Sequence, residues 1–363
     1  MRASRGIQLG AIAVAGVLVL AACGSKAATS TGTSSGSSSG SAAAAFKACM
    51  VTDIGGINDK SFNASAWAGM EGAQKDGKAT VKYIESKTEA DYTTNISNLL
   101  SEKCNLIVTV GGLMGTATGD AAKANPNQHF AEVDYPGNGT NWQGLQFNAA
   151  QGGFLGGYLA AGYSKSGKVA TYGGLQIAPV TVYMDGFAEG VAYYNQQKGT
   201  NVAVLGWDEA SQKGSFAGGF TDQSQGQTLA KNFIQQGADV IFPVAGSVGI
   251  GTAAEVQSEG KGVVIWVDTD GCLSATQYCN IFLSTVFKNV QGSVQTAVES
   301  DSAGNFVAKD YLGTLSNGGT GLSPFHQFDS KVSTSLKDEL KQVQADIVSG
   351  KITIKSPAQP KVS

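Results

Sequence analysis

Histidine is nearly absent from this sequence, which has only His129 and His326 among 363 residues. This scarcity argues against a hydrolase triad and against a histidine general base, because both place an imidazole beside the reacting group. The cysteines lack the CxxC spacing that is typical of structural zinc sites, so we expect no metal. The sequence also has no nucleophile elbow. We therefore expect a protein that is not an enzyme and has no cofactor.

Charged residues are also few, at 15% of the chain, and the net charge is −3. The sequence contains no basic block that would contact nucleic acid and no polybasic face for anionic lipid. We therefore expect no nucleic-acid partner. The longest apolar run, near the N-terminus, is shorter than the roughly 20 residues that a membrane-spanning helix needs.

Residues 1–22 are typical of a secretory signal peptide, with two arginines before the short apolar run. The sequence Leu-Ala-Ala-Cys then ends at Cys23 and resembles a bacterial lipobox. This resemblance implies cleavage before Cys23 and lipid attachment to its sulfur; the alternative is a soluble exported protein with an incidental cysteine. Residues 23–45 are rich in Ser, Gly and Ala, and we expect a flexible tether there. The expected location is the extracytoplasmic face of the cell membrane, with the lipid as anchor.

Four further cysteines form an even set, and outside the cell such cysteines usually pair. Cys272 and Cys279 flank one short loop, so a bond between them is the simplest closure. Cys49 and Cys104 lie at the start of two predicted strands. If those strands are parallel neighbours, both thiols lie at the same end of a sheet and could bridge.

From residue 46 onward, strand-like and helix-like patterns alternate, which predicts an α/β fold with parallel sheets and right-handed crossovers. The predicted strands cover residues 48–52, 79–84, 105–110, 129–133, 144–147, 169–172, 201–205, 239–242, 262–267 and 280–285, and a last short one covers 351–354. The length exceeds a single ordinary core, so we expect two doubly wound lobes joined by a hinge of several strands. We assign residues 46–147 and 270–312 to lobe 1, and 148–269 and 313–363 to lobe 2.

Polar and aromatic residues follow the predicted strands, and ligands of α/β sheets bind outside the carboxyl ends of the strands. The candidate ligand-binding residues are Asp53, Asn58, Asp59, Phe62, Asn63, Asp134, Phe220, Gly246, Asp268 and Lys288, the last at the start of a predicted helix. For the first group, an ordinary loop with an aspartate N-cap is the alternative. So many carboxylates would repel phosphate, whereas a neutral ligand with hydroxyl and N–H donors suits them, because ionised carboxylates only accept hydrogen bonds.

Several motifs together resemble one family. They are DIGGINDKSFN at 53–63 with Trp67-x-Gly69, FNAAQGGFLGGYLAA at 147–161, GFTD at 219–222, GADVIFPVAG at 237–246, VDTD at 267–270 and LSTVFK at 283–288. The chain is similar to the basic membrane protein family of lipoproteins, which are substrate-binding proteins of ABC importers that bind purine nucleosides. This resemblance implies a type I periplasmic-binding-protein fold, with the ligand enclosed between two lobes and delivered to an ABC transporter permease.

The resemblance also implies roles for the candidate residues. Phe62 and Phe220 would hold the purine between two aromatic faces, although the stretch 207–218 departs from the family pattern, so Phe216 competes for the second position. Asp134 would accept hydrogen bonds from the base, and Asp268 would accept them from ribose hydroxyls with Lys288 beside it. Residues Asp53 and Asn63 and the backbone at Gly246 would complete the rim.

The expected function is therefore capture of a purine nucleoside, such as adenosine, guanosine or inosine, by a monomer. One alternative keeps the fold and changes the ligand to a sugar or a small signalling molecule, since this fold hosts many solutes. Another alternative is an exported nucleoside hydrolase, which would turn over inosine.

Overall fold

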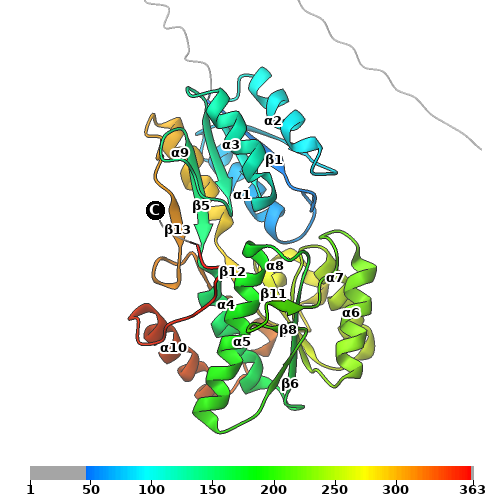
Figure 1. The fold of residues 1–363 in the computed structure, drawn as a ribbon. Helices are drawn as coiled ribbons and strands as arrows, with labels where there is room; N and C mark the ends of the chain where they lie inside the picture. The colour runs from blue at the N-terminus through cyan, green and yellow to red at the C-terminus, as the bar shows by residue number, and fades with distance from the viewer. Residues whose placement is uncertain (1–45, 361–363) are drawn as a thin grey trace, which may run out of the picture. The chain divides into compact units, whose positions relative to one another are not determined.

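The computed structural model describes residues 46–360, which contain two six-stranded sheets with helices packed on them (Figure 1). The signal peptide, Cys23 and the tether predicted for residues 1–45 lie outside the described residues. The first sheet has the order β13-β5-β4-β3-β1-β2, and all its strands are parallel. Its strands are β1 (Lys47–Thr52), β2 (Thr80–Glu85), β3 (Leu106–Val110), β4 (His129–Val133), β5 (Trp142–Phe147) and β13 (Tyr311–Gly313).

The second sheet has the order β14-β12-β11-β10-β6-β7, and only β14 is antiparallel to its neighbour. Its strands are β6 (Lys168–Gly173), β7 (Ala203–Leu205), β10 (Val240–Val244), β11 (Val263–Asp268), β12 (Phe282–Lys288) and β14 (Thr320–Leu322). A small hairpin of β8 (Trp207–Asp208) and β9 (Lys213–Gly214) forms a separate pair.

Helices cover both faces of each sheet, which is why central strands such as β3 and β11 are mainly apolar and are buried along their whole length. On the first sheet, one face packs against α1 (Phe62–Lys75) and α9 (Val290–Ser302), and the other against α2 (Asp91–Ser101) and α3 (Gly115–Ala124). On the second sheet, one core cluster joins α4 (Ala149–Tyr163), α5 (Ala178–Lys198) and α10 (Thr334–Val348). The opposite cluster joins α6 (Gln223–Gln235) and α7 (Val248–Glu259) to β10 and β11.

Helices α4 and α5 pack with their backbones in direct contact, which fixes the start of α5. A Cβ atom at Gly153 would lie 2.5 Å from the carbonyl oxygen of Tyr183, and one at Gly157 would collide with the carbonyl oxygen of Phe187. Gly153 and Gly157 therefore serve helix packing, since a larger side chain at either would separate the two helices.

The predicted α/β fold class is confirmed, and each expected strand before residue 290 is present within a few residues of its predicted range. The strand predicted over 351–354 is wrong, because this segment pairs with no strand. The lobe assignment of residues 270–288 is also wrong. Strand β12 pairs in parallel with β11, from Val264–Phe282 to Asp268–Phe287, so the chain stays with the second sheet through Lys288.

The chain passes between the two sheets at three neighbouring places. Asn148 follows β5, Asn289 follows β12, and residues 314–319 connect β13 to β14. The crossings are hydrogen-bonded to one another. The backbone N–H of Asn148 donates to the carbonyl of Gly313 at 2.8 Å, and the backbone N–H of Asn289 donates to the carbonyl of Gly319 at 2.9 Å. This arrangement is the hinge of several strands that the sequence predicts.

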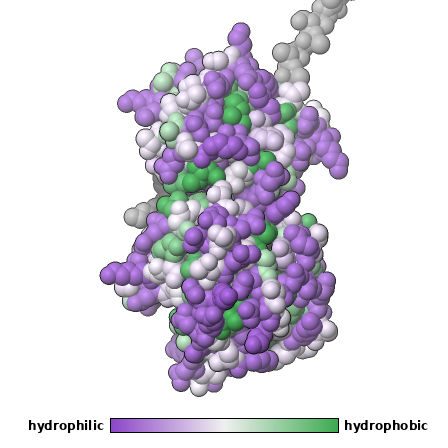
Figure 2. All heavy atoms as spheres, turned by 90° about the vertical axis from the view of Figure 1, so that its right-hand side faces the viewer, coloured by the Kyte–Doolittle hydropathy of each residue, from purple (hydrophilic) through white to green (hydrophobic). Residues whose placement is uncertain are grey.

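Both suggested cysteine pairs are bonded in the structure. Cys49 and Cys104 have Cα atoms 5.9 Å apart at one end of the neighbouring strands β1 and β3, and Cys272 and Cys279 close a short loop at 4.5 Å. Among residues 46–360, no helix is long and apolar enough to cross a membrane. Figure 2 shows hydrophilic side chains over most of the face that it presents, with hydrophobic ones gathered mainly at mid-height.

Candidate ligand-binding site

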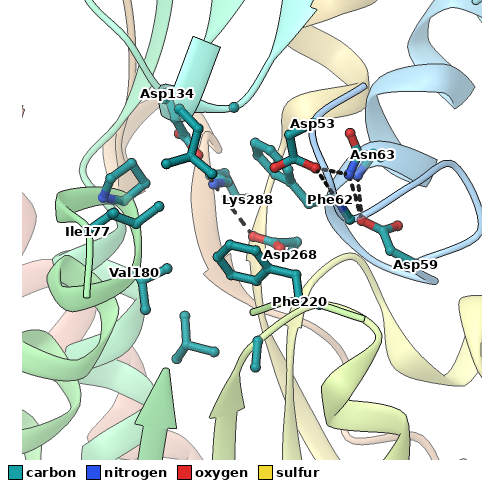
Figure 3. A pocket seen from close by; sticks show the side chains of 18 of the residues that line it. Asp53, Asp59, Phe62, Asn63, Asp134, Ile177, Val180, Phe220, Asp268 and Lys288 are labelled. Atoms are coloured by element: carbon teal, nitrogen blue, oxygen red, sulfur yellow. Dashed lines mark hydrogen bonds and ion pairs between the residues drawn. The ribbon is translucent and has the colours of Figure 1, made fainter. Parts of the chain in front are cut away.

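A cavity with about 540 Å³ of empty space, partly open to solvent, lies where residues that follow the strands of the two sheets face each other (Figure 3). Its lining residues include every predicted ligand-binding residue except one: Asp53, Asp59, Phe62, Asn63, Asp134, Phe220, Gly246, Asp268 and Lys288. The exception is Asn58, which is exposed and is not among the lining residues. In this turn its neighbour Asp59 points inward, so the sequence prediction for Asn58 is wrong.

The carboxylate of Asp59 caps the start of α1. It accepts hydrogen bonds from the backbone N–H groups of Ser61 at 3.0 Å, Asn63 at 2.8 Å and Ala64 at 3.1 Å. Burial raises the pKa of Asp59 to about 7, although these N–H groups favour the charged form. The Asn63 side-chain amide also donates to Asp59, at 3.2 Å. The N-cap residue of α1 is Ser61, and Asp59 supplies a capping carboxylate from two residues before it. At the cavity, Asp59 orients Asn63.

Asp53 presents one free oxygen atom to the cavity. Its Oδ1 accepts from the backbone N–H of Gly55 at 2.8 Å and from Nδ2 of Asn63 at 2.7 Å. Its Oδ2 contacts no donor among residues 46–360 and lies against Gly111, where a Cβ atom would be only 2.8 Å away. Gly111 has a φ of 113°, which favours glycine. Burial raises the pKa of Asp53 to about 6.

Asp134, Lys288 and Asp268 form one buried charged cluster. Nζ of Lys288 lies 2.6 Å from Oδ2 of Asp134 and 3.6 Å from Oδ1 of Asp268, so its shorter contact is with Asp134. Burial lowers the pKa of Lys288, but the two carboxylates outweigh this effect and raise it. Burial raises the pKa of Asp134, against the effect of Lys288. Lys288 reaches this cluster as the last residue of β12, and the prediction that it begins a helix is wrong.

The backbone turns both aspartates of this cluster out of their strands. Asp134, directly after β4, has a φ of 67°, and Asp268, the last residue of β11, has a φ of 65°. Left-handed backbone is uncommon for residues other than glycine and is often found at functional sites. Asp268 is held further by the hydroxyls of Ser61 and Tyr183, each at 2.8 Å.

Two phenylalanine rings line the cavity from the two sheets. Phe62 begins α1, and Nζ of Lys288 lies 4.4 Å from its ring centroid, within the range of a cation–π contact. Phe220 precedes α6, and its carbonyl oxygen accepts a hydrogen bond from the Ser247 hydroxyl at 2.7 Å. Phe216 does not line the cavity, since it packs edge-on against Trp207 at 5.9 Å. The structure thus places Phe220, and not Phe216, opposite the first sheet.

Sequence reasoning missed the residues that α5 and its preceding loop contribute: Ile177, Pro179, Val180 and Tyr183. It also missed Leu113, which follows β3, and the role of the Ser61 hydroxyl. The apolar spacing of α5 identifies a buried helix, but it does not tell which of its buried residues face a cavity. The glycine pair 111–112, directly after β3, also lines the cavity.

Among residues 46–360, one group of potential metal ligands is found, and it lies outside this cavity. Asp270, Cys272 and His326 lie close together, and Nε2 of His326 is 2.7 Å from Oδ2 of Asp270. Cys272 is bonded to Cys279, so its sulfur is not a thiolate that could bind a metal. We therefore assign this group no metal.

The cavity therefore combines three kinds of chemistry: free carboxylate oxygens that accept hydrogen bonds, one buried ammonium, and two aromatic rings. Such a set suits a flat, uncharged ligand with several N–H and O–H donors.

The described part of the chain is similar in sequence to known proteins. The family model described as ABC transporter substrate-binding protein, PnrA-like, matches residues 46–358. The ABC transporter nucleoside-binding protein BmpA of Lactococcus lactis is 30% identical, over 97% of this chain and 99% of its own. The CD4+ T-cell-stimulating antigen of Listeria innocua is 32% identical, over 96% of each chain.

A solved structure has the same fold. The structure of an ABC transporter solute-binding protein from Aeropyrum pernix is similar with a TM-score of 0.78 and 24% identity, over 86% of this chain and 94% of that one. The periplasmic-binding-protein fold of type I that the family resemblance implies is confirmed.

Proposed function

Because this chain belongs to the PnrA-like family of ABC transporter substrate-binding proteins, we propose that its cavity binds a purine nucleoside for delivery to an ABC importer. Adenosine, guanosine and inosine are the candidate ligands. The observation that carries the proposal is the pair of rings, Phe62 and Phe220, in one cavity with the carboxylates of Asp53, Asp134 and Asp268.

In this proposal, the purine lies between the two rings, because stacking on aromatic side chains tolerates any purine. Asp134 accepts hydrogen bonds from the base, and Asp268 accepts them from ribose hydroxyls. Lys288 contacts both carboxylates and keeps their oxygens oriented toward the ligand. The free Oδ2 of Asp53 supplies one more acceptor for an N–H group. An uncharged nucleoside avoids the repulsion that these carboxylates would exert on a phosphate.

Calorimetric titration of the purified protein with the three nucleosides tests the proposal. We expect Phe62→Ala and Phe220→Ala each to weaken binding by about 1–3 kcal/mol, the usual contribution of one stacked base. Phe216→Leu is the matched control, since Phe216 lies outside the cavity, and we expect it to leave affinity unchanged. Binding of D-ribose or another sugar in place of all three nucleosides would overturn the proposal.

We also propose that the protein releases its nucleoside unchanged, so incubation with inosine yields no free hypoxanthine. For the segment before residue 46, we propose lipid attachment at Cys23 and an extracytoplasmic location, on the lipobox-like sequence alone. Cys23→Ser then removes the anchor, and the protein moves from the membrane fraction to the soluble fraction. The folded part acts as a monomer, which sedimentation of the mature chain would test.

A further inference from the structure

We propose that the nucleoside bound by this protein carries an apolar substituent, which occupies a second cavity beside the first. This inference rests on the proposed function and makes the class of ligand more specific. The substituent lies on whichever end of the nucleoside is next to Asp134: the exocyclic N6 of the purine, or the 5′ position of the ribose if the ligand binds in the opposite direction.

The second cavity adjoins the first. It has about 1120 Å³ of empty space, part of which is open to solvent. Five residues line both cavities: Gly112, Leu113, Asp134, Ile177 and Pro179. In this proposal, a ligand held between the two rings extends past Asp134 along these shared residues into the second cavity.

Apolar side chains line most of this second cavity. Those that belong to it alone are Tyr135, Pro136, Phe147, Ala178, Val182, Pro357, Ala358 and Pro360. The side-chain amides of its two glutamines are already used within the protein. Nε2 of Gln146 donates to Asp310 at 3.0 Å, and Nε2 of Gln359 donates to the carbonyl of Ile354 at 2.9 Å. The remaining polar side chains are Tyr135, with its hydroxyl, and Asp134, whose Oδ2 is paired with Lys288. A group that enters this space therefore finds apolar contacts and few free hydrogen-bonding partners.

The C-terminal wall of the second cavity is fixed in place by hydrogen bonds. Ser356, directly before the wall, donates to the buried carboxylate of Asp185 at 2.5 Å. Oε1 of Gln359 accepts from Nδ2 of Asn148 at 2.9 Å, at the crossing between the sheets. Lys355 is held as well, because its backbone N–H donates to Glu189 at 2.8 Å. The wall is thus a built part of the second cavity, and none of its residues lines the first.

An unsubstituted nucleoside would fill the first cavity and leave these apolar walls to water. An apolar substituent would cover them, and removal of apolar surface from water favours binding. We therefore expect a substituted nucleoside to bind at least as tightly as adenosine.

Calorimetric titration with adenosine, N6-benzyladenosine and 5′-benzylthio-5′-deoxyadenosine tests this inference. One of the two substituted nucleosides should bind at least as tightly as adenosine, and its identity reports the direction of binding. Ala358→Trp fills the second cavity without touching the first, and should weaken that ligand at least tenfold while adenosine changes less than twofold. Ala358→Leu should give a smaller loss, and Ala210→Trp, at an exposed alanine outside both cavities, should give none.

The inference is overturned if adenosine binds and both substituted nucleosides bind at least tenfold more weakly. It is also overturned if Ala358→Trp leaves the affinity for the substituted ligand unchanged. In either case the proposed function stands, because adenosine still binds. If no nucleoside binds to the unmodified protein, the proposed function itself fails and this inference fails with it.

Discussion

The hydroxyl of Ser61 donates a hydrogen bond of 2.8 Å to the carboxylate of Asp268, and the two residues belong to different sheets of the fold. Ser61 precedes α1 of the first sheet, whereas Asp268 ends β11 of the second. The same hydroxyl lies 3.2 Å from the carbonyl oxygen of Val267, and the indole N–H of Trp266 donates to the carbonyl of Lys60 at 3.4 Å. The carboxylate that we assign to the ribose therefore also joins the two halves of the site.

Removal of this hydroxyl should weaken ligand binding without unfolding the protein. In Ser61→Ala, Asp268 loses one of its two hydroxyl donors, and a hydrogen bond to a charged group contributes about 1.5–3 kcal/mol. We expect nucleoside affinity to fall roughly tenfold or more in calorimetric titration. Ser97→Ala, an exposed serine on α2 with only a local hydrogen bond, is the control and should bind normally. Equal affinity of the two variants would show that the contact between the sheets does not contribute to binding.

Asp53 should make the stability of the unliganded protein depend on pH. Burial raises its pKa to about 6 in the folded protein, from 3.8 in the unfolded chain. The folded state therefore binds more protons between these values, and the free energy of unfolding falls as pH rises from about 4 to 6. The loss above pH 6 is on the order of 3 kcal/mol, since one pKa unit corresponds to about 1.4 kcal/mol.

The variant Asp53→Asn keeps the acceptor that Gly55 and Asn63 use and cannot ionise. We expect it to be more stable than the unmodified protein at pH 7.5, with a flatter stability profile between pH 4 and 6, in urea titrations followed by circular dichroism. Its affinity for a nucleoside should nevertheless fall, because the free Oδ2 acceptor becomes an N–H donor. A variant that gains stability and keeps full affinity would show that this oxygen does not contact the ligand.

Lys288 should stabilise the folded protein chiefly by neutralising its two buried partners. In Lys288→Met, Asp134 and Asp268 stay buried without a counter-charge, and removal of one member of a buried pair commonly costs about 3–5 kcal/mol. We expect a loss of this size in unfolding free energy, measured by urea titration without ligand. The double variant Lys288→Met with Asp134→Asn should recover a substantial part of it. If the double variant is as unstable as the single one, the loss comes from packing and not from charge.

The candidate site was predictable from the sequence where it depends on the ends of strands. Asp53, Asp134 and Asp268 each follow or end a strand, and the alternating pattern places strand ends at one edge of a parallel sheet. Whether a residue at such an edge points inward is not set by this pattern. Asn58 and Asp59 are adjacent in one turn, and the structure buries only Asp59, because it caps α1.

Features that depend on which distant segments pack together were not predictable in the same way. Tyr183 lies in a helix whose register relative to the cavity depends on its contact with Gly153 of another helix. The return of the chain to the first sheet at Asn289 depends on the pairing of β12 with β11, and the residues around the predicted boundary, 270–272, carry no signal for that pairing. The local sequence patterns predicted the strands and helices, whereas the pairing of distant strands determines which lobe each one belongs to.

The two disulfides should differ in how much they stabilise the folded protein. Cys49 and Cys104 are 55 residues apart, whereas Cys272 and Cys279 are 7 apart, and in the chain-entropy model a cross-link restricts the unfolded chain more when it closes a longer loop. Replacement of the first pair by serines should lower the unfolding free energy by about 4 kcal/mol, and replacement of the second by about 2.5 kcal/mol. Urea titration of the two double variants, each compared with the oxidised parent, measures both values.

Neither pair touches the first cavity, so both variants should keep their nucleoside affinity while they remain folded. A larger loss from the second pair would mean that its loop, which follows Asp268 closely, supports the folded state by contacts and not through the unfolded chain.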